Sequence, residues 1–162
     1  MARKLLAMAA VAAALVTTAV PAAAAPGSAS RNGHTLSASN ATDLVVAGET
    51  ITVTGTGYDP AKGYYVALCQ VPDDYSYGAA PTPCLGGDGQ GGTGVGPSAW
   101  VTNLPGGTAT IAANGSFTAQ IHIKQAGGNL DCAQVTCAIV TRRDHLGLSD
   151  RSFDVFIPAS WQ

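Results

Sequence analysis

The stretch AGETITVTGTGYDPAKGYYVALCQ, residues 47–70, decides the fold class of this chain. Its first part, Thr50–Thr54, places Ile51 and Val53 on one face and threonines on the other, which is the two-residue period of a half-buried strand. A glycine-rich turn follows, and Tyr64–Cys69 then carries apolar side chains on both faces. A strand of this kind is typical of the middle of a sheet that has something packed on each side.

Similar strand signals continue downstream. An Asn-Gly pair at 114–115 predicts a hairpin between Thr108–Ala112 and Ser116–Lys124, and the second of these segments alternates cleanly between apolar and polar residues. Cys137–Arg142 and Ser152–Ile157 predict a last hairpin. About seven short strands without a helical period indicate an all-β protein, namely an immunoglobulin-like, seven-stranded antiparallel Greek-key sandwich.

The amino terminus has the three-part pattern of a secretory signal peptide. Arg3 and Lys4 precede an apolar run, Leu5–Val20, and small residues follow up to Ala24. The apolar run of about 16 residues is short for the roughly 20 that span a bilayer. We therefore expect residues 1–24 to be a cleaved signal peptide, the protein to be secreted, and no segment to span the membrane.

One domain remains after cleavage. Residues 25–34 are small and polar and predict a flexible entry segment, and residues 35–162 are long enough for one β-sandwich domain that begins with an edge strand at Thr35–Ser39. The signal contains two of the eight bases, so six bases face ten acids and the mature net charge is about -4. Such a surface disfavours direct binding of nucleic acid. We expect a monomer.

The four cysteines all lie in the exported part of the chain, where an even number indicates a disulfide framework. Three pairings are possible, and proximity in the sequence favours Cys69 with Cys84 and Cys132 with Cys137. Closing these loops removes about 3 and about 2 kcal/mol of unfolded-chain entropy on the loop formula. A zinc site would need CxxC spacing and nearby histidines, so we expect no metal.

Three segments together carry a family resemblance. Residues 47–70, ANGSFTAQIHI at 113–123 and LDCAQVTCAIV at 130–140 resemble the apoproteins of enediyne chromoproteins, the neocarzinostatin, macromomycin and actinoxanthin family. The resemblance implies a seven-stranded sandwich with two disulfides and a cleft that holds an enediyne chromophore without a covalent bond. It also implies an antibiotic carrier from an actinomycete-like source, whose bound ligand, not the protein, would damage DNA.

The resemblance also implies where a ligand would bind. It places the disulfide between Cys69 and Cys84 at the floor of the cleft, on the same face as Tyr65 and Ala67. A hydrophobic polycyclic ligand needs an apolar floor and aromatic walls. Aromatic residues in or beside the expanded loop between these cysteines supply wall candidates, although tyrosines there can equally cover core edges. The predicted ligand-binding residues are Tyr65, Ala67, Cys69, Gln70, Val71, Tyr75, Tyr77, Cys84, Trp100 and Ala138.

Some positions depart from the family pattern. Val71 stands where the family has a tryptophan, and Ala138 replaces a glutamine. The loop between Cys69 and Cys84 is longer than in the family, and the ribbon Lys124–Asp131 is shorter.

No group of residues predicts an enzyme. Asp144, His145 and Asp150 beside Ser149 could form a hydrolase triad, but an exposed hairpin tip is the simpler interpretation. The neighbouring pair Arg142–Arg143 predicts an edge strand whose charged side chains prevent it from pairing with another chain.

Two hypotheses of function follow. The first is a secreted carrier of a hydrophobic small molecule, with no cofactor other than a possible enediyne-like chromophore. The second is a non-catalytic extracellular or envelope-associated recognition module that uses the glycine-rich loop at 85–97 as its contact surface. An open apolar cleft beside Cys69 and Cys84 would favour the carrier, and a filled or flat face there would favour the module.

Overall fold

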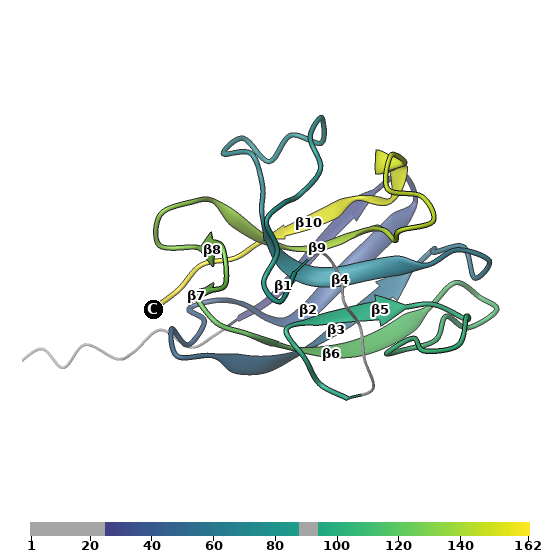
Figure 1. The fold of residues 1–162 in the computed structure, drawn as a ribbon, viewed down its shortest axis with the longest axis horizontal. Coiled ribbons are helices and arrows are strands. Elements are labelled where there is room, and N and C mark those ends of the chain that lie inside the picture. Colours follow the sequence, from purple (N-terminus) through teal and green to yellow (C-terminus); the bar gives the residue numbers. More distant parts are fainter. Residues whose placement is uncertain (1–24, 88–93) are drawn as a thin grey trace, which may run out of the picture.

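The computed structural model describes residues 25–87 and 94–162, so the predicted signal peptide at 1–24 and the middle of the glycine-rich loop at 88–93 lie outside the described residues. Two four-stranded antiparallel sheets pack face to face (Figure 1). The first sheet has the order β1 (Ala25–Arg31), β2 (His34–Thr42), β3 (Glu49–Thr56) and β6 (Phe117–Ile123). The second has the order β10 (Val155–Pro158), β9 (Cys137–Arg143), β4 (Tyr64–Gln70) and β5 (Ser98–Val101).

Two short elements complete the described fold. A two-stranded ribbon, β7 (Ala126–Gly127) and β8 (Leu130–Asp131), leads from β6 to β9, and a 3-10 turn at Arg151–Phe153 precedes β10. The predicted all-β antiparallel sandwich is thus confirmed. Within residues 25–87 and 94–162, no helix has the length and apolar character needed to cross a membrane.

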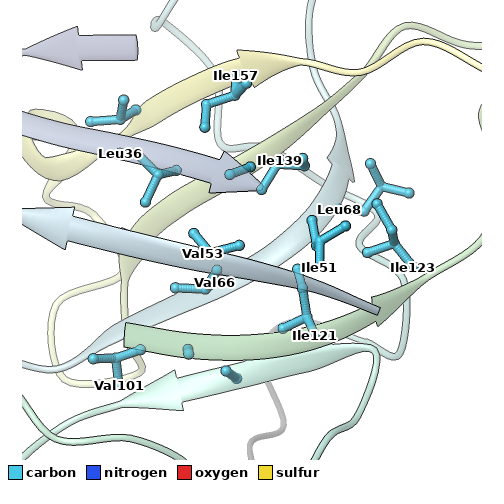
Figure 2. Packing of buried hydrophobic residues seen from close by; sticks show 14 of the residues in the cluster. Leu36, Ile51, Val53, Val66, Leu68, Val101, Ile121, Ile123, Ile139 and Ile157 are labelled. Atoms are coloured by element: carbon cyan, nitrogen blue, oxygen red, sulfur yellow. The ribbon is translucent and has the colours of Figure 1, made fainter. Parts of the chain in front are cut away.

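The core lies between the two sheets, as the alternating patterns predict. On β6 the alternate residues Phe117, Ala119, Ile121 and Ile123 are buried, and the residues between them are exposed. Ile51 pairs with Ile121 across the β3–β6 ladder. Side chains from both sheets meet here, among them those labelled in Figure 2: Leu36, Ile51, Val53, Val66, Leu68, Val101, Ile121, Ile123, Ile139 and Ile157.

The entry segment predicted to be flexible at 25–34 is instead ordered, which corrects the sequence analysis. Strand β1 occupies most of it and pairs with β2 through a tight turn at Asn32 and Gly33, whose φ angles are 52° and 83°. Gly27 lets this strand lie close to the second sheet, since a Cβ there would lie 2.5 Å from Ile157 Cγ2. Strand β2 is therefore internal rather than an edge, and the described sandwich has eight strands instead of seven.

The hairpin predicted around the Asn-Gly pair at 114–115 forms only its turn and its second strand. Thr108–Ala112 is not a strand, because the side-chain amide of Asn103 forms hydrogen bonds with the backbone N–H and carbonyl of Ile111. Asn103 Nδ2 donates to the Ile111 carbonyl at 3.0 Å, and Ile111 N donates to Asn103 Oδ1 at 3.0 Å. These bonds satisfy the groups that a sheet ladder would otherwise pair.

Candidate functional site

Both predicted disulfides, Cys69–Cys84 and Cys132–Cys137, are present. The first ties the end of β4 to the long β4–β5 connection. Leu85 N donates to the Leu68 carbonyl at 2.8 Å, and Gln70 N donates to the Pro83 carbonyl at 2.9 Å, so residues 83–85 run alongside β4. The second disulfide joins the segment after the ribbon to the start of β9.

A second apolar cluster lies on the outer face of the β10-β9-β4-β5 sheet, separate from the core between the sheets. Its residues come from β4, β9, β10 and the segments flanking the first disulfide, and we call it the outer cluster: Ala67, Cys69, Val71, Cys84, Ala138, Val140 and Phe156. All seven are buried. The prediction that β4 has something packed on both of its faces is therefore confirmed.

Residues of the β4–β5 connection cover the outer cluster. Tyr75 and Tyr77 pack against it. The Tyr77 ring stacks on Phe156, with centroids 4.4 Å apart and an interplanar angle of 21°. On Tyr77 also lies the guanidinium of Arg31, 4.0 Å from the ring centroid. The face that the resemblance assigns to the cleft floor is therefore filled by the chain itself.

Polar contacts hold this covering loop, residues 72–83, at both ends. Thr136 Oγ1 donates to Asp73 Oδ1 at 2.6 Å, and Arg142 Nη1 donates to the Pro81 carbonyl at 3.0 Å. Arg142 is buried, because β9 lies between β4 and β10 rather than at an edge. The prediction of a charged edge strand at Arg142–Arg143 was therefore wrong.

Two of the predicted ligand residues lie farther along the same face. Tyr65 and Trp100 are cross-strand partners on β4 and β5. Tyr65 Oη lies 2.7 Å from His145 Nδ1, and Trp100 Nε1 donates to Asp144 Oδ2 at 3.1 Å. Asp144 is fully buried, whereas His145 is exposed, so the predicted hairpin tip begins only after Asp144.

The structure thus divides nine of the ten predicted ligand residues between two places, and Gln70 belongs to neither. Tyr65 and Trp100 lie with His145, and the buried members belong to the outer cluster with Tyr75 and Tyr77 beside them. Tyr65, Gln70, Tyr75, Tyr77 and Trp100 are half-buried. Ligand contact by any of the ten stays a prediction.

A buried charge near the covering loop was not foreseen. Asp154 is fully buried, and Arg151 Nη1 lies 3.3 Å from its Oδ2. Arg31 Nη1 donates to the backbone carbonyl of Asp154 at 3.2 Å. Burial raises the pKa of Asp154 to about 7, although the arginines nearby act in the opposite direction. This carboxyl therefore titrates near neutral pH.

A pocket of about 970 Å³ opens on the other side of the first disulfide, a volume suited to a small organic molecule. We call it the glycine-lined pocket. Its lining comes from the β4–β5 connection, from His122 near the end of β6 and Lys124 directly after it, and from the β7–β8 ribbon and its turn. Its described lining residues are Ala47, Thr82, Pro83, Cys84, Leu85, Gly86, Gly87, Val95, Gly96, Pro97, His122, Lys124, Gly127, Gly128 and Asn129.

Glycines let the walls of this pocket approach one another. A Cβ on Gly86 would lie 2.1 Å from Pro97 Cγ, and one on Gly127 would lie 3.0 Å from Leu85 Cδ1. Of the ten predicted ligand residues, only Cys84 lines the pocket. His122 and Lys124 were missed because they read as solvent-facing positions of an alternating strand. Nothing in that pattern shows that a loop and a ribbon come to lie beside them.

No group of three His, Cys, Asp or Glu side chains is placed to hold a metal ion in the part of the chain that the structure describes. The strand order and the two disulfides define a disulfide-stapled antiparallel β-sandwich. The model of the neocarzinostatin family matches residues 36–153, and the chain belongs to that family.

Individual proteins are also similar to this chain. Macromomycin has a similar solved structure, with a TM-score of 0.50 and 21% identity, covering 80% of this chain and 99% of macromomycin. That likeness supports the fold alone. A curated protein of Corynebacterium glutamicum called thiamine biosynthesis protein X is 33% identical over 102 residues, which are 62% of this chain and 50% of that protein. The chain therefore spans about half the length of this relative.

Proposed function

We propose that this protein is a secreted, non-catalytic binding protein that holds a small, largely apolar molecule in the glycine-lined pocket. The pocket itself carries the proposal, because it combines a ligand-sized volume with apolar walls at Leu85, Val95 and Pro97 and a few polar groups. The family membership supports a binding role. The two disulfides fit a protein that works outside the cell.

The proposed binding mode differs from the one that the family resemblance implies. Tyr75 and Tyr77 pack on the outer cluster, with Tyr77 stacked on Phe156, so a chromophore covering this face would first have to displace them. A ligand in the glycine-lined pocket would still contact the first disulfide through Cys84. An enediyne-like chromophore is one candidate ligand, and any DNA damage would come from it and not from the protein.

The curated relative widens the range of candidate ligands. Its name connects that protein to thiamine biosynthesis, so thiamine and its phosphates belong in a binding panel for this chain. Thiamine itself carries a positive charge on its thiazolium ring. The pocket contains Lys124 and no acidic residue among its described lining, so we expect the unphosphorylated vitamin to bind weakly.

A second candidate function is recognition of another protein or a surface without a small ligand. The filled face above Cys69 favours it, and so does the covering loop, which projects from the body of the sandwich (Figure 1). In that case the exposed part of residues 72–83 would be the contact surface.

Purification of the secreted protein from its native host tests the carrier directly. We expect an ultraviolet-absorbing small molecule to co-elute and to be released by organic solvent. The matched variants are Gly96→Phe, at a glycine that lines the pocket and where a Cβ would lie 3.6 Å from Ser98 O, and Gly78→Phe, at an exposed glycine with no atom within 4 Å of such a Cβ. The first should lose the ligand and the second should keep it. If the wild-type protein is purified without a ligand and also fails to bind aromatic probes, the carrier function is excluded and only the recognition function remains.

A further inference from the structure

We infer that the glycine-lined pocket selects ligands that carry an anionic group, a carboxylate, sulfonate or phosphate, joined to an apolar ring system. The anionic group binds at Lys124, and the rings lie against Leu85 and Pro97. This inference rests on the proposed function, and it adds a chemical class to a ligand that is otherwise defined only by size and hydrophobicity.

Lys124 lies at the ribbon end of the pocket, directly after β6. Its Cε and Nζ are 2.7 and 3.3 Å from the point where Gly127 would carry a Cβ, and Leu85 Cδ1 is 3.0 Å from the same point. The ammonium group and an apolar wall therefore meet at Gly127. A ligand that places rings on the wall brings a substituent within reach of the ammonium group.

The charge of Lys124 is not neutralised by the described residues around it. Among residues 25–87 and 94–162, no carboxylate forms an ion pair with Lys124, whereas Lys62 pairs with Asp59 at 3.4 Å. The described lining of the pocket contains no aspartate or glutamate. This lining is thus cationic in a mature chain whose net charge is about -4, and an anionic ligand would find a counter-charge there.

Carboxylates on the neighbouring strands form hydrogen bonds with groups other than Lys124. Glu49 on β3 accepts hydrogen bonds from Asn40 Nδ2 at 2.6 Å and from Val45 N at 2.9 Å. Asp131 on β8 accepts from Ala133 N at 3.0 Å.

His122 adds a polar group on the same side as Lys124, two residues earlier on β6. Its Nδ1 lies 3.2 Å from Thr50 Oγ1, which holds the imidazole in place at the pocket wall. The remainder of the described lining is glycine backbone and apolar side chains, apart from Thr82 and Asn129. This composition suits a ligand with one charged end and an apolar body.

Two fluorescent probes with the same ring system separate the charge from the rings. 8-Anilinonaphthalene-1-sulfonate carries a sulfonate, and N-phenyl-1-naphthylamine is its uncharged counterpart. Lys124 is exposed, so we expect Lys124→Gln to weaken binding of the sulfonate about fivefold, the upper range for an exposed ion pair, and to leave the neutral probe unchanged. Lys62→Gln, which removes a lysine paired outside the pocket, should change neither. Added salt should weaken the sulfonate only.

The outcomes test the anion preference and the proposed function of the pocket separately. Both probes could bind equally well, with binding blocked by Gly96→Phe but unaffected by Lys124→Gln. That result would overturn the anion preference and would still support the pocket as the binding site. Binding of both probes that is insensitive to Gly96→Phe would overturn the proposed function. Circular dichroism and thermal unfolding of each variant identify any that has lost its fold, and Lys124→Met then provides a second uncharged side chain of similar length.

Discussion

Tyr77 stacks on Phe156 with ring centroids 4.4 Å apart, although 79 residues separate the two in the sequence. The contact joins the covering loop to the last strand of the sheet and completes the outer cluster. Arg31, from the first strand, adds a cation to the same ring. Three distant parts of the chain thus meet over the face that the family resemblance assigns to a ligand.

The Tyr77 ring should therefore contribute measurably to stability. We expect Tyr77→Ala to lower the free energy of unfolding by about 1–2 kcal/mol, since it removes an aromatic pair and a cation–π contact. Tyr77→Phe keeps the stacking geometry and should cost much less. Urea unfolding of the mature protein with both disulfides intact measures the difference. Equal stability of the alanine and phenylalanine variants would show that the loop does not rest on Phe156 in solution.

Asp154 should make stability depend on pH in an unusual direction. Burial raises its pKa to about 7 from an ordinary value near 3.8, so the folded state holds a proton that the unfolded state has released. Its contribution to the free energy of unfolding is thus greatest below about pH 4, falls as the pH rises to about 7, and is constant above that.

Replacing this carboxyl isolates its effect from those of the other carboxylates. We expect the difference in unfolding free energy between Asp154→Asn and the wild type to shift in favour of the variant between pH 4 and 7. Asp150→Asn is the control, since hydrogen bonds from Ser152 lower the pKa of Asp150 and its contribution is lost as the pH falls. A difference for Asp154→Asn that stays constant across this range would contradict the raised pKa.

Two glycines with similar φ angles provide a matched test of backbone packing. Gly33 has φ +83° and no atom within 4 Å of the position that a Cβ would take, whereas Gly115 has φ +78° and a Cβ there would lie 2.5 Å from the Tyr58 carbonyl oxygen. We expect Gly33→Ala to cost about 1 kcal/mol from the left-handed conformation alone. Gly115→Ala should cost at least about twice as much, because the backbone of Tyr58 must move. Thermal unfolding compares the two, and equal costs would refute the close approach.

Much of the sandwich could be predicted from local patterns. The alternation in Phe117–Ile123 and the two apolar faces of Tyr64–Cys69 correspond to β6 and β4, and proximity selected the right cysteine pairs. The hairpin at Asn32 and Gly33 had the same Asn-Gly signal as the pair at 114–115, and weighing it would have revealed β1. The local sequence thus contains the signal for this hairpin.

Other features could not be read from neighbouring residues. Arg142 looked like a surface residue, yet β9 lies between two strands and the covering loop buries it. Thr108–Ala112 has strand-forming residues, but Asn103 satisfies the backbone of Ile111 instead. In both cases the deciding partner lies on another segment of the chain, beyond the reach of local periodicity.

The sequence by itself determined the all-β class, the core faces of the central strands and the disulfide framework, because these follow from side-chain period and short loop closure. Only the tertiary structure decided where a ligand could enter. The covering loop packs Tyr77 on the outer cluster, which contains the expected floor residue Cys69. The ribbon meets Leu85 at Gly127 and leaves a pocket beside Lys124. Such a hollow depends on how two irregular segments pack on each other, and no periodic pattern encodes that packing.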